Sequence, residues 1–297
     1  MPIALVTGAS GFTGRYMVEA LVKQGFKVVG LGSKPTAASE TLACDLTDLG
    51  AVNECVERVS PDWVVHLAAL SFVGHEDQKA FYDVNVFGTL NLLQALSSLG
   101  KKPSRILVAS SANVYGTPDI GEIDEGVGPS PVNHYACSKL AMEHMVATWF
   151  EKLPIIIARP FNYTGPHQTS RFLVPKIVNH FAEKSPEIEL GNIDVSRDFS
   201  DVRDVINAYL ALLKNDVCST VVNISSGSDT ALRTIIEKMN NLAGYEIEVK
   251  VNPAFVRSNE IPRLCGSNQR LKQLTGWHPE YSLDETLQDM FATARGV

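Results

Sequence analysis

The chain has 297 residues, of which 45% are hydrophobic and 20% charged, enough to bury a full core in one unit or in two lobes. A net charge of −7 and a pI near 5.5 argue against a surface that binds nucleic acid or an anionic membrane, and no apolar stretch approaches the roughly 18 residues of a membrane-spanning helix. Five widely spaced cysteines without a Cys-x-x-Cys pair, scattered histidines, and an N-terminus that leads directly into a strand-like run are typical of a cytoplasmic protein with reduced thiols, no signal peptide and no metal site.

Strand-like and helical patterns alternate through the first half of the chain. Apolar runs predict strands at 3–7, 26–31, 63–67, 105–110 and 154–159. Helical spacing predicts helices near 12–24, 48–59, 78–99 and 134–151. Alternating elements of this kind predict an α/β fold with a Rossmann-type, doubly wound parallel sheet. We therefore expect residues 1–160 to form a dinucleotide-binding domain.

The pattern changes after residue 160, where Gly, Pro and Asn become frequent and the predicted elements become shorter. Helices are expected near 172–184, 202–214, 231–243, 268–275 and 283–295. We interpret residues 161–297 mostly as a smaller C-terminal lobe that binds substrate, interleaved with the last elements of the sheet domain.

A glycine-rich loop connects the first predicted strand to the first helix and reads Gly8-Ala-Ser-Gly11-Phe12-Thr13-Gly14. Strand, glycine turn and helix are the context that a dinucleotide-binding fingerprint requires. Glycine allows a tight turn and a close approach to a pyrophosphate, and the helix N-terminus offers free N–H groups. The spacing is Gly-x-x-Gly-x-x-Gly, and a simple flexible loop is the alternative. We expect Gly8, Gly11, Phe12, Thr13 and Gly14 to bind a nucleotide cofactor.

Other candidate residues also lie just after predicted strands. Ala68 follows the third strand, Ser110 and Ser111 the fourth, and Arg159 and Pro160 the fifth. Ligands of doubly wound sheets bind outside the carboxyl ends of the strands, at the switch point of the strand order. His66, at the end of the third strand, is expected to be structural rather than a ligand.

Tyr135 and Lys139 lie four residues apart in a predicted helix, and Ser111 lies upstream. Residues at i and i+4 share a helix face, so the Lys139 ammonium is expected near the Tyr135 phenol, lowering its pKa from about 10. Ser111 can donate a hydrogen bond to a substrate oxygen that shares the tyrosine proton. The trio predicts interconversion of a carbonyl and an alcohol. The alternative is an ordinary surface pair, because Tyr-x-x-x-Lys occurs by chance in many helices.

Together these motifs resemble the extended short-chain dehydrogenase/reductases that act on nucleotide sugars. The resemblance covers nearly the whole chain and rests on Thr7-Gly-Ala-Ser-Gly-Phe-Thr-Gly14, Asp45-Leu46, His66-Leu-Ala-Ala69, Asn85-Val-Phe-Gly-Thr-Leu-Asn-Leu-Leu93, Ser110-Ser-Ala-Asn-Val-Tyr-Gly116, Tyr135-x-x-x-Lys139 and Arg159-Pro-Phe-Asn162.

This resemblance implies roles for individual residues. Ser111, Tyr135 and Lys139 would be catalytic, and Lys139 would also bind the nicotinamide ribose. Asn85 belongs to one of these motifs, but an amide that supports helix packing or the backbone is an equally good explanation for it. The remaining cofactor contacts implied by the resemblance are Asp45, Leu46, Leu67, Ala68, Ala69, Arg159 and Pro160.

The residues after the second predicted strand bear on the choice of cofactor. NAD sites usually place a carboxylate there, against the ribose 2′-hydroxyl. This chain instead has Ser33 and Lys34, which, together with Arg15, suit a 2′-phosphate. We therefore expect NADP(H), with NAD(H) as the second candidate. The alternative is that Lys34 is an ordinary solvated lysine.

Two residues beside Ser111 bear on the type of reaction. In related sugar-nucleotide 4,6-dehydratases an acidic residue follows the catalytic hydroxyl and performs the elimination of water. Ala112 and Asn113 occupy these places here, and neither can act as a carboxylate acid or base. The resemblance therefore argues against dehydration and leaves a 4-reductase or a 4-epimerase.

The C-terminal half is most similar to the reductases of this group that convert GDP-4-keto-6-deoxy-D-mannose to GDP-D-rhamnose. That resemblance implies that Arg197 and Arg257 bind the diphosphate and that Glu260 binds the ribose of GDP. Guanidinium groups also suit phosphate oxygens on geometric grounds. A local ion pair between Arg197 and Asp198, or a solvated Arg257, is the alternative. Further implied substrate contacts are Asn113, Asn162 and Lys176.

In this interpretation NADPH delivers hydride to C4 while Tyr135 donates a proton. The alternatives are an epimerase that retains NAD, a reductase that forms the C4 epimer GDP-6-deoxy-D-talose, and a nucleotide-sensing protein without activity. Segments 78–99 and 134–151 are rich in apolar residues and correspond to helices that pair across a dimer in this group. A homodimer is expected, although these helices could simply pack on the sheet.

Overall fold

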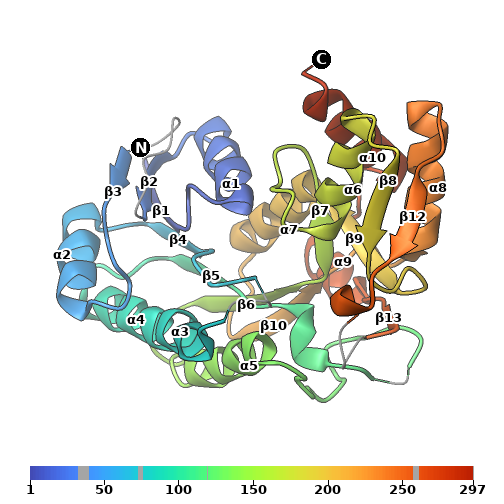
Figure 1. Ribbon diagram of the computed structural model, residues 1–297. Helices are drawn as coiled ribbons and strands as arrows, with labels where there is room; N and C mark the ends of the chain where they lie inside the picture. Colours follow the sequence, from blue (N-terminus) through green and yellow to red (C-terminus); the bar gives the residue numbers. More distant parts are fainter. Residues whose placement is uncertain (33–39, 73–75, 119, 257–260, 297) are drawn as a thin grey trace.

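A computed structural model describes residues 1–32, 40–72, 76–118, 120–256 and 261–296 of the protein. Within these residues, seven parallel strands form the main sheet in the order β10-β6-β5-β4-β1-β2-β3 (Figure 1). The strands of this sheet are β1 (Ile3–Thr7), β2 (Lys27–Leu31), β3 (Glu40–Leu42), β4 (Trp63–His66), β5 (Arg105–Ala109), β6 (Ile155–Pro160) and β10 (Thr220–Ile224).

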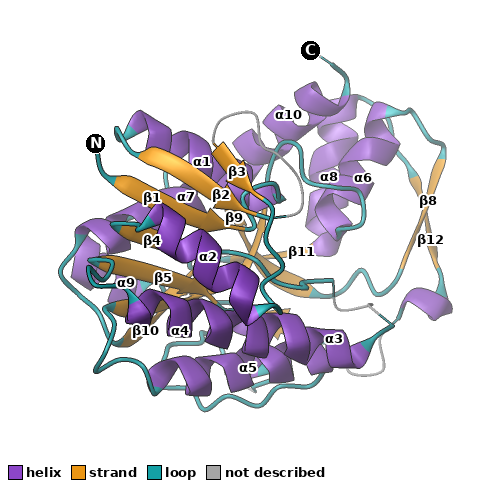
Figure 2. Cartoon of the chain, turned by 90° about the vertical axis from the view of Figure 1, so that its left-hand side faces the viewer, coloured by secondary structure: helices purple, strands orange, loops and turns teal. Residues whose placement is uncertain are grey.

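Helices cover both faces of this sheet. Buried side chains of α1 (Phe12–Lys23), α7 (Val202–Lys214) and α9 (Gln269–Thr275) form one core with the sheet. Those of α2 (Leu49–Val59), α4 (Thr89–Ser98) and α5 (His134–Ala147) form a second core on the opposite face. Figure 2 shows α2, α4 and α5 running together along their side of the sheet. The predicted doubly wound Rossmann fold is confirmed.

Strand β6 shows why this sequence forms a parallel sheet. All six residues of Ile-Ile-Ile-Ala-Arg-Pro are buried, and the strand pairs with β5 on one side and β10 on the other. A strand covered on both faces reads as a continuous apolar run, which the sequence made easy to find. Two strands of this seven-stranded sheet were not predicted individually. β3 has only three partly exposed residues, and β10 comes from the C-terminal half of the chain.

A C-terminal lobe lies beside the sheet domain, at the right of Figure 1. It has its own core, formed by α6 (Leu173–Ala182), α8 (Leu232–Ala243), α10 (Leu283–Ala294) and the parallel pair β8 (Glu187–Leu190) and β12 (Glu248–Val251). A small sheet connects the lobe to the sheet domain and consists of β7 (Asn162–Thr164), β9 (Ser196–Asp201), β11 (Asp229–Ala231) and β13 (Arg263–Leu264). The assignment of substrate binding to this lobe stays a prediction.

The predicted helix 78–99 is divided into three parts. These are α3 (Gln78–Tyr82), a π-helical segment η1 (Asp83–Gly88) and α4. Short π-helical segments are often found at functional sites. The predicted helix 134–151 ends earlier than expected, at Ala147. Two short 3₁₀ segments complete the elements, η2 (Ala112–Tyr115) and η3 (Pro253–Phe255). No helix in the described part of the chain is long and apolar enough to cross a membrane.

Candidate active site

The glycine loop lies at the switch point of the sheet, where β4 and β2 flank β1. Gly8 has a φ of +69°, and a Cβ there would lie 2.8 Å from the backbone nitrogen of Ala68. A Cβ on Gly14 would lie 2.1 Å from the carbonyl oxygen of Gly8. The amide of Gly11 donates to that same oxygen at 3.0 Å. The loop is therefore a tightly packed turn that requires glycine, which contradicts the simple flexible loop.

Helix α1 begins directly after this turn without a side-chain cap. Its N-cap residue is Gly11, and its first turn contains no acidic residue. Uncapped N–H groups and the helix dipole favour an anion at this position. The packed glycine turn and the uncapped helix fit the pyrophosphate of a dinucleotide.

Tyr163 of β7 holds the first turn of α1, and its role was missed in the sequence. Its hydroxyl hydrogen-bonds to Thr13 Oγ1 at 2.7 Å, and its ring stacks on Phe12 with centroids 6.1 Å apart. Tyr163 directly follows Asn162 in the Arg-Pro-Phe-Asn motif, so its neighbours in the sequence were the available signal. Two residues expected to contact cofactor are thus fixed from the side of the C-terminal lobe.

His66 is structural, as expected. It is 2% exposed and hydrogen-bonds through Nδ1 to Thr7 at 2.7 Å and through Nε2 to Thr89 at 2.8 Å. The Thr89 hydroxyl already donates to a carbonyl, that of Asn85, so Nε2 must be the donor and Nδ1 the acceptor. Burial lowers the pKa of His66 to about 3 and keeps it neutral.

Asn85 supports the backbone of the cofactor cleft. Its Oδ1 accepts from the amide of Leu70 at 2.9 Å, and its Nδ2 donates to the Leu70 carbonyl at 3.2 Å and to Ser138 Oγ at 3.0 Å. This side chain lies in the π-helical segment η1 and joins the segment after β4 to α5. Of the roles considered for Asn85, the structure supports the one as a backbone-supporting amide.

Ser111, Tyr135 and Lys139 come together at the carboxyl end of β5. Asn133 caps α5 by accepting from the amide of Ala136 at 2.9 Å, which places Tyr135 in the first turn of the helix. The three side chains are between 4% and 8% exposed, so they are not an ordinary surface group. Ser111 Oγ accepts from the amide of Asn113 at 3.2 Å, and its hydroxyl lies near enough to the Tyr135 phenol to affect the pKa of that group.

The pKa of Tyr135 differs from the sequence-based expectation. Burial raises it to about 12, and this effect outweighs that of the nearby Ser111 hydroxyl, which lowers it. The expectation that Lys139 lowers this pKa was wrong for this structure. Burial withdraws the phenol from water, which disfavours its charged form. At neutral pH Tyr135 is therefore protonated, which is the form needed to donate a proton.

Lys139 is held beneath the same edge of the sheet. Its Nζ donates to the carbonyl oxygen of Ala109 at 2.8 Å. Burial lowers its pKa to about 8, and the charge of Glu143 partly opposes this effect. The lysine is therefore still mostly charged at neutral pH.

Arg159 and Pro160 lie at the end of β6 and are both buried. The guanidinium of Arg159 forms an ion pair with Glu143 at 2.5 Å and lies over the Tyr115 ring, 4.8 Å from its centroid. Glu143 was not singled out in the sequence. Two nitrogens of this guanidinium, Nε and Nη2, thus donate to Glu143.

The other predicted cofactor residues lie along the carboxyl edge of the sheet. Asp45 is exposed and accepts two hydrogen bonds from Thr47, which lower its pKa. Leu46 is 8% exposed, and its carbonyl accepts from Asn91 at 2.8 Å. Leu67, Ala68 and Ala69 are half-buried directly after β4. Ser33 and Lys34 lie outside the described residues.

The predicted substrate contacts on the C-terminal side lie on different elements. Asn162 is exposed on β7. Arg197 on β9 donates to the carbonyl of Ser196 at 2.8 Å, and Asp198 accepts from the amide of Ser226 at 2.9 Å. Lys176 on α6 donates to the Glu189 carbonyl at 2.6 Å. Asn113 is half-buried beside Ser111, and Arg257 and Glu260 lie outside the described residues.

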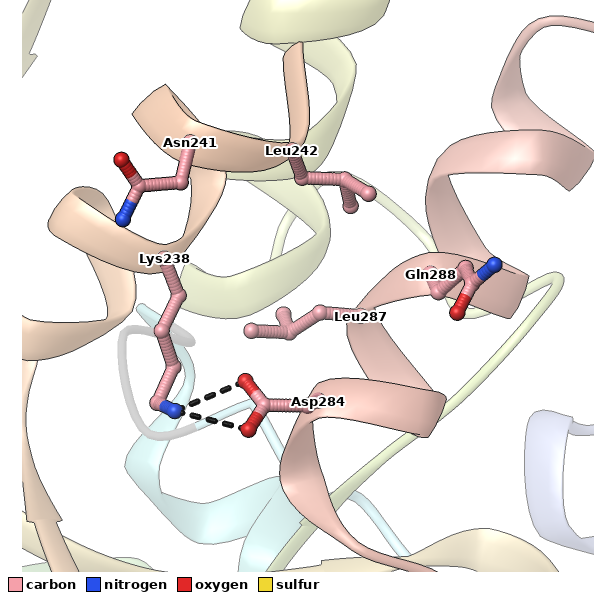
Figure 3. Close-up of a pocket in the computed structure, with 6 residues that line it drawn as sticks. All are labelled: Lys238, Asn241, Leu242, Asp284, Leu287 and Gln288. Carbon is pink, nitrogen blue, oxygen red and sulfur yellow. Dashed lines mark hydrogen bonds and ion pairs between the residues drawn. The ribbon is translucent and has the colours of Figure 1, made fainter. Parts of the chain in front are cut away.

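A hollow of about 310 Å³ lies between α8 and α10 in the C-terminal lobe (Figure 3). The ammonium of Lys238 and the carboxylate of Asp284 form an ion pair across it at 2.7 Å. None of the residues that line this hollow is a predicted site residue. We therefore place the chemistry at the sheet edge and not in this hollow.

A dinucleotide cradle at the switch point, with a buried serine, tyrosine and lysine at the carboxyl end of β5, defines an extended short-chain dehydrogenase/reductase. The family model described as GDP-mannose 4,6-dehydratase matches residues 5–290, and the chain belongs to this family.

Two relatives and two solved structures are informative. The chain is 37% identical to a GDP-6-deoxy-D-talose 4-dehydrogenase of Aggregatibacter actinomycetemcomitans over 92% of its own length and 90% of the relative. It is 36% identical to a GDP-6-deoxy-D-mannose reductase of Pseudomonas aeruginosa over 95% of its own length and 94% of the relative. A solved structure of RMD from Pseudomonas aeruginosa with NADPH has a TM-score of 0.88 at 33% identity, covering 100% of this chain and 99% of that one. A Burkholderia cenocepacia structure, provisionally described as an epimerase, has a TM-score of 0.94 at 45% identity, covering 100% and 99%.

Proposed function

We propose that the protein reduces the C4 ketone of GDP-4-keto-6-deoxy-D-mannose to GDP-D-rhamnose. The observation that best supports this proposal is the buried Tyr135 phenol, which lies with Ser111 and Lys139 at the carboxyl end of β5, close to the glycine turn. A reductase needs a proton donor at this position, and the 36% identical relative from Pseudomonas aeruginosa is a GDP-6-deoxy-D-mannose reductase.

The proposed mechanism assigns one task to each member of the trio. NADPH, when bound, supplies the hydride for C4. Tyr135 donates its phenolic proton to the C4 oxygen as negative charge develops there. Ser111 orients that oxygen, because its Oγ already accepts from the Asn113 amide and its own proton is available to donate. Lys139, one helical turn after Tyr135, would bind the nicotinamide ribose through its ammonium group and so hold the cofactor at the reaction centre.

The C-terminal lobe is proposed to hold the nucleotide. Arg197 and Arg257 would bind the diphosphate, Glu260 the ribose, and Asn113, Asn162 and Lys176 would complete the contacts. Lys176 and Arg197 currently donate to backbone carbonyls, and phosphate oxygens accept the same donors more strongly. Fixing the GDP group in this way would hold C4 at the reaction centre, which lowers the barrier by positioning. Ser33 and Lys34 are proposed to favour NADPH over NADH.

The test is to incubate the protein with GDP-4-keto-6-deoxy-D-mannose and either NADPH or NADH. Loss of reduced cofactor is followed by absorbance, and the sugar product is identified by NMR. The proposal expects stoichiometric oxidation of NADPH and the rhamno configuration at C4. Absence of oxidation with both cofactors would contradict it.

A second candidate function is formation of the C4 epimer, GDP-6-deoxy-D-talose. It is favoured by the 37% identity to a GDP-6-deoxy-D-talose 4-dehydrogenase. Both reactions use the same proton donor, so the configuration of C4 in the NMR spectrum distinguishes them. A 4-epimerase would instead retain NAD tightly through purification and would not consume added NADPH.

We further propose that the protein works in the cytoplasm as a homodimer. All five cysteines are free thiols, in agreement with a reducing compartment. Phe87 is 54% exposed and lies on η1, which packs against α5. A second protomer could cover this side chain. Sedimentation equilibrium of the wild type and of Phe87→Asp tests this proposal. A dimeric wild type and a monomeric variant are expected, and a monomeric wild type would contradict the dimer.

A further inference from the structure

A buried polar cluster lies behind the catalytic edge and consists of Ser110, Glu143 and Arg159. Ser110 Oγ donates to Glu143 Oε1 at 2.5 Å, and Arg159 donates to Oε1 from Nε at 2.9 Å and to Oε2 from Nη2 at 2.5 Å. The three residues are 4%, 5% and 6% exposed. A buried carboxylate is stable only with such a complete set of partners. The cluster joins the segment after β5 to α5 and β6.

Glu143 is linked to two members of the catalytic trio, to Lys139 along α5 and to Ser111 through Ser110. It follows Lys139 by four residues on α5 and therefore shares its helix face. Its partner Ser110 directly precedes Ser111, and the amide of Ser110 donates to Ala158 at 2.7 Å. A single carboxylate thus connects the residue next to Ser111 to the helix that bears Tyr135 and Lys139.

The buried Lys139 ammonium also requires a negative charge nearby. Burial lowers its pKa to about 8, and the charge of Glu143 acts in the opposite direction. On the same helix Tyr135 is protonated and neutral, because burial raises its pKa to about 12.

Ionisable groups on the neighbouring elements do not provide this charge. His66 on β4 is neutral, with a pKa lowered to about 3, and Arg159 on β6 is positive. Tyr115 on η2 is neutral because burial raises its pKa. Asp83 on η1 is paired with Lys79 near the surface. Glu143 is therefore the charge that favours the ammonium form of Lys139.

A purely structural role is the simpler explanation. The pair of Glu143 and Arg159 would then only hold α5 against β6. Buried ion pairs are often no more stabilising than apolar side chains of similar volume. A structural role predicts that replacing the pair changes stability without changing the titration of Lys139.

We propose that Glu143 is a positioning residue for the reaction, whose carboxylate aligns the Ser111 segment with α5 and keeps Lys139 in its charged form. The positioning role rests on the proposed reductase function, but the first test measures Lys139 and does not need the substrate.

The first test is the titration of Lys139 by ¹³C NMR in protein labelled at the lysine ε-carbons, with the signal assigned by Lys139→Met. In Glu143→Gln, which is nearly isosteric, the pKa of Lys139 is expected to fall by about one unit, because an opposite charge at close range is removed. Glu125→Gln is the matched control. Glu125 is another buried carboxylate with an arginine partner, Arg270 at 3.5 Å, and no Lys139 shift is expected there.

A second variant covers the case in which Glu143→Gln does not fold. Glu143→Gln/Arg159→Gln removes both buried charges, and the pKa of Lys139 is expected to fall there by less, because loss of the positive Arg159 partly opposes loss of the carboxylate. In each variant the alkaline decline of kcat/KM for NADPH should move to lower pH by the same amount as the pKa of Lys139. An unchanged Lys139 titration in a folded variant would overturn the inference. If the titration shifts but the wild type does not reduce the GDP-sugar, the proposed function fails and the role of Glu143 in keeping Lys139 charged stands.

Discussion

The catalytic edge and the C-terminal lobe hold their candidate residues in different ways. Ser111, Tyr135 and Lys139 are buried, and the side chains of Ser111 and Lys139 are hydrogen-bonded to neighbouring backbone groups. On the lobe side, Asn162 is exposed, and the half-buried Arg197 donates to the backbone carbonyl of Ser196. A donor near the surface can exchange a carbonyl for a phosphate oxygen at little cost. The buried hydrogen bonds of the catalytic edge cannot be rearranged without disturbing the core. We infer that the fold sets the chemistry and that adjustable side chains choose the substrate.

The largest effect is expected for Tyr135→Phe, which removes the proton donor and keeps the ring. kcat should fall by about 10²- to 10⁴-fold, the usual contribution of general acid catalysis. The Kd for NADPH, measured by fluorescence titration, should change little, because the ring still fills its place beside Phe81. Turnover at the wild-type rate would mean that another group donates the proton.

A smaller effect is expected for Arg197→Ala on the lobe side. Loss of a charge-assisted hydrogen bond costs about 1.5–3 kcal/mol, so kcat/KM for the GDP-sugar should fall roughly 10- to 150-fold. The effect should appear mainly in KM and not in kcat. Arg233→Ala is the control, because Arg233 is exposed and pairs with Asp194 at the surface. Equal losses in the two variants would argue against diphosphate binding by Arg197.

The pH dependence should come from the catalytic edge. The charged form of Lys139 is needed, and its pKa is lowered to about 8, so activity is present below this pH and is lost as the pH rises through it. kcat/KM for NADPH reports groups of the free enzyme and should decline about tenfold per pH unit above pH 8. A decline that begins only near pH 10 would show that Lys139 is not the titrating group.

The smallest effect is expected where the two regions touch. Tyr163→Phe removes the hydrogen bond to Thr13 and keeps the stacking on Phe12. A single neutral hydrogen bond contributes about 0.5–1.5 kcal/mol, so the Kd for NADPH should rise roughly 2- to 12-fold. Tyr245→Phe is the matched control, because its hydroxyl binds a carbonyl of the C-terminal lobe at 3.2 Å. No difference between the two would show that the Thr13 contact is irrelevant to cofactor binding.

The parts of the site that depend on local sequence could be predicted. Gly8 and Gly14 occur where a side chain would collide with the backbone, and Tyr135 and Lys139 share a helix whose start is set by a neighbouring cap. Each of these relations involves few residues along the chain, so composition and spacing contain the information. The glycine turn, the first helix and the position of the trio followed from such patterns.

Relations between distant residues could not be predicted in the same way. Glu143 gave no signal, because it lies on helix α5 and its partner Arg159 is contributed by strand β6. The direction of the Tyr135 pKa was wrong because burial depends on the assembled protein, whereas the spacing to Lys139 is visible in the sequence. The π-helical turn that contains Asn85 also escaped prediction, since its residues follow an ordinary helical pattern.

The edge strand β10 has a consequence for how the protein is made. Residues 220–224 pair with β6, so the sheet is complete only after about three quarters of the chain has left the ribosome. Until then the apolar strand Ile155–Pro160 presents an unpaired edge, which is a site for aggregation. A fragment that ends near residue 160 would keep that edge permanently. During synthesis the nascent chain therefore depends on its C-terminal half, or on a chaperone, for protection.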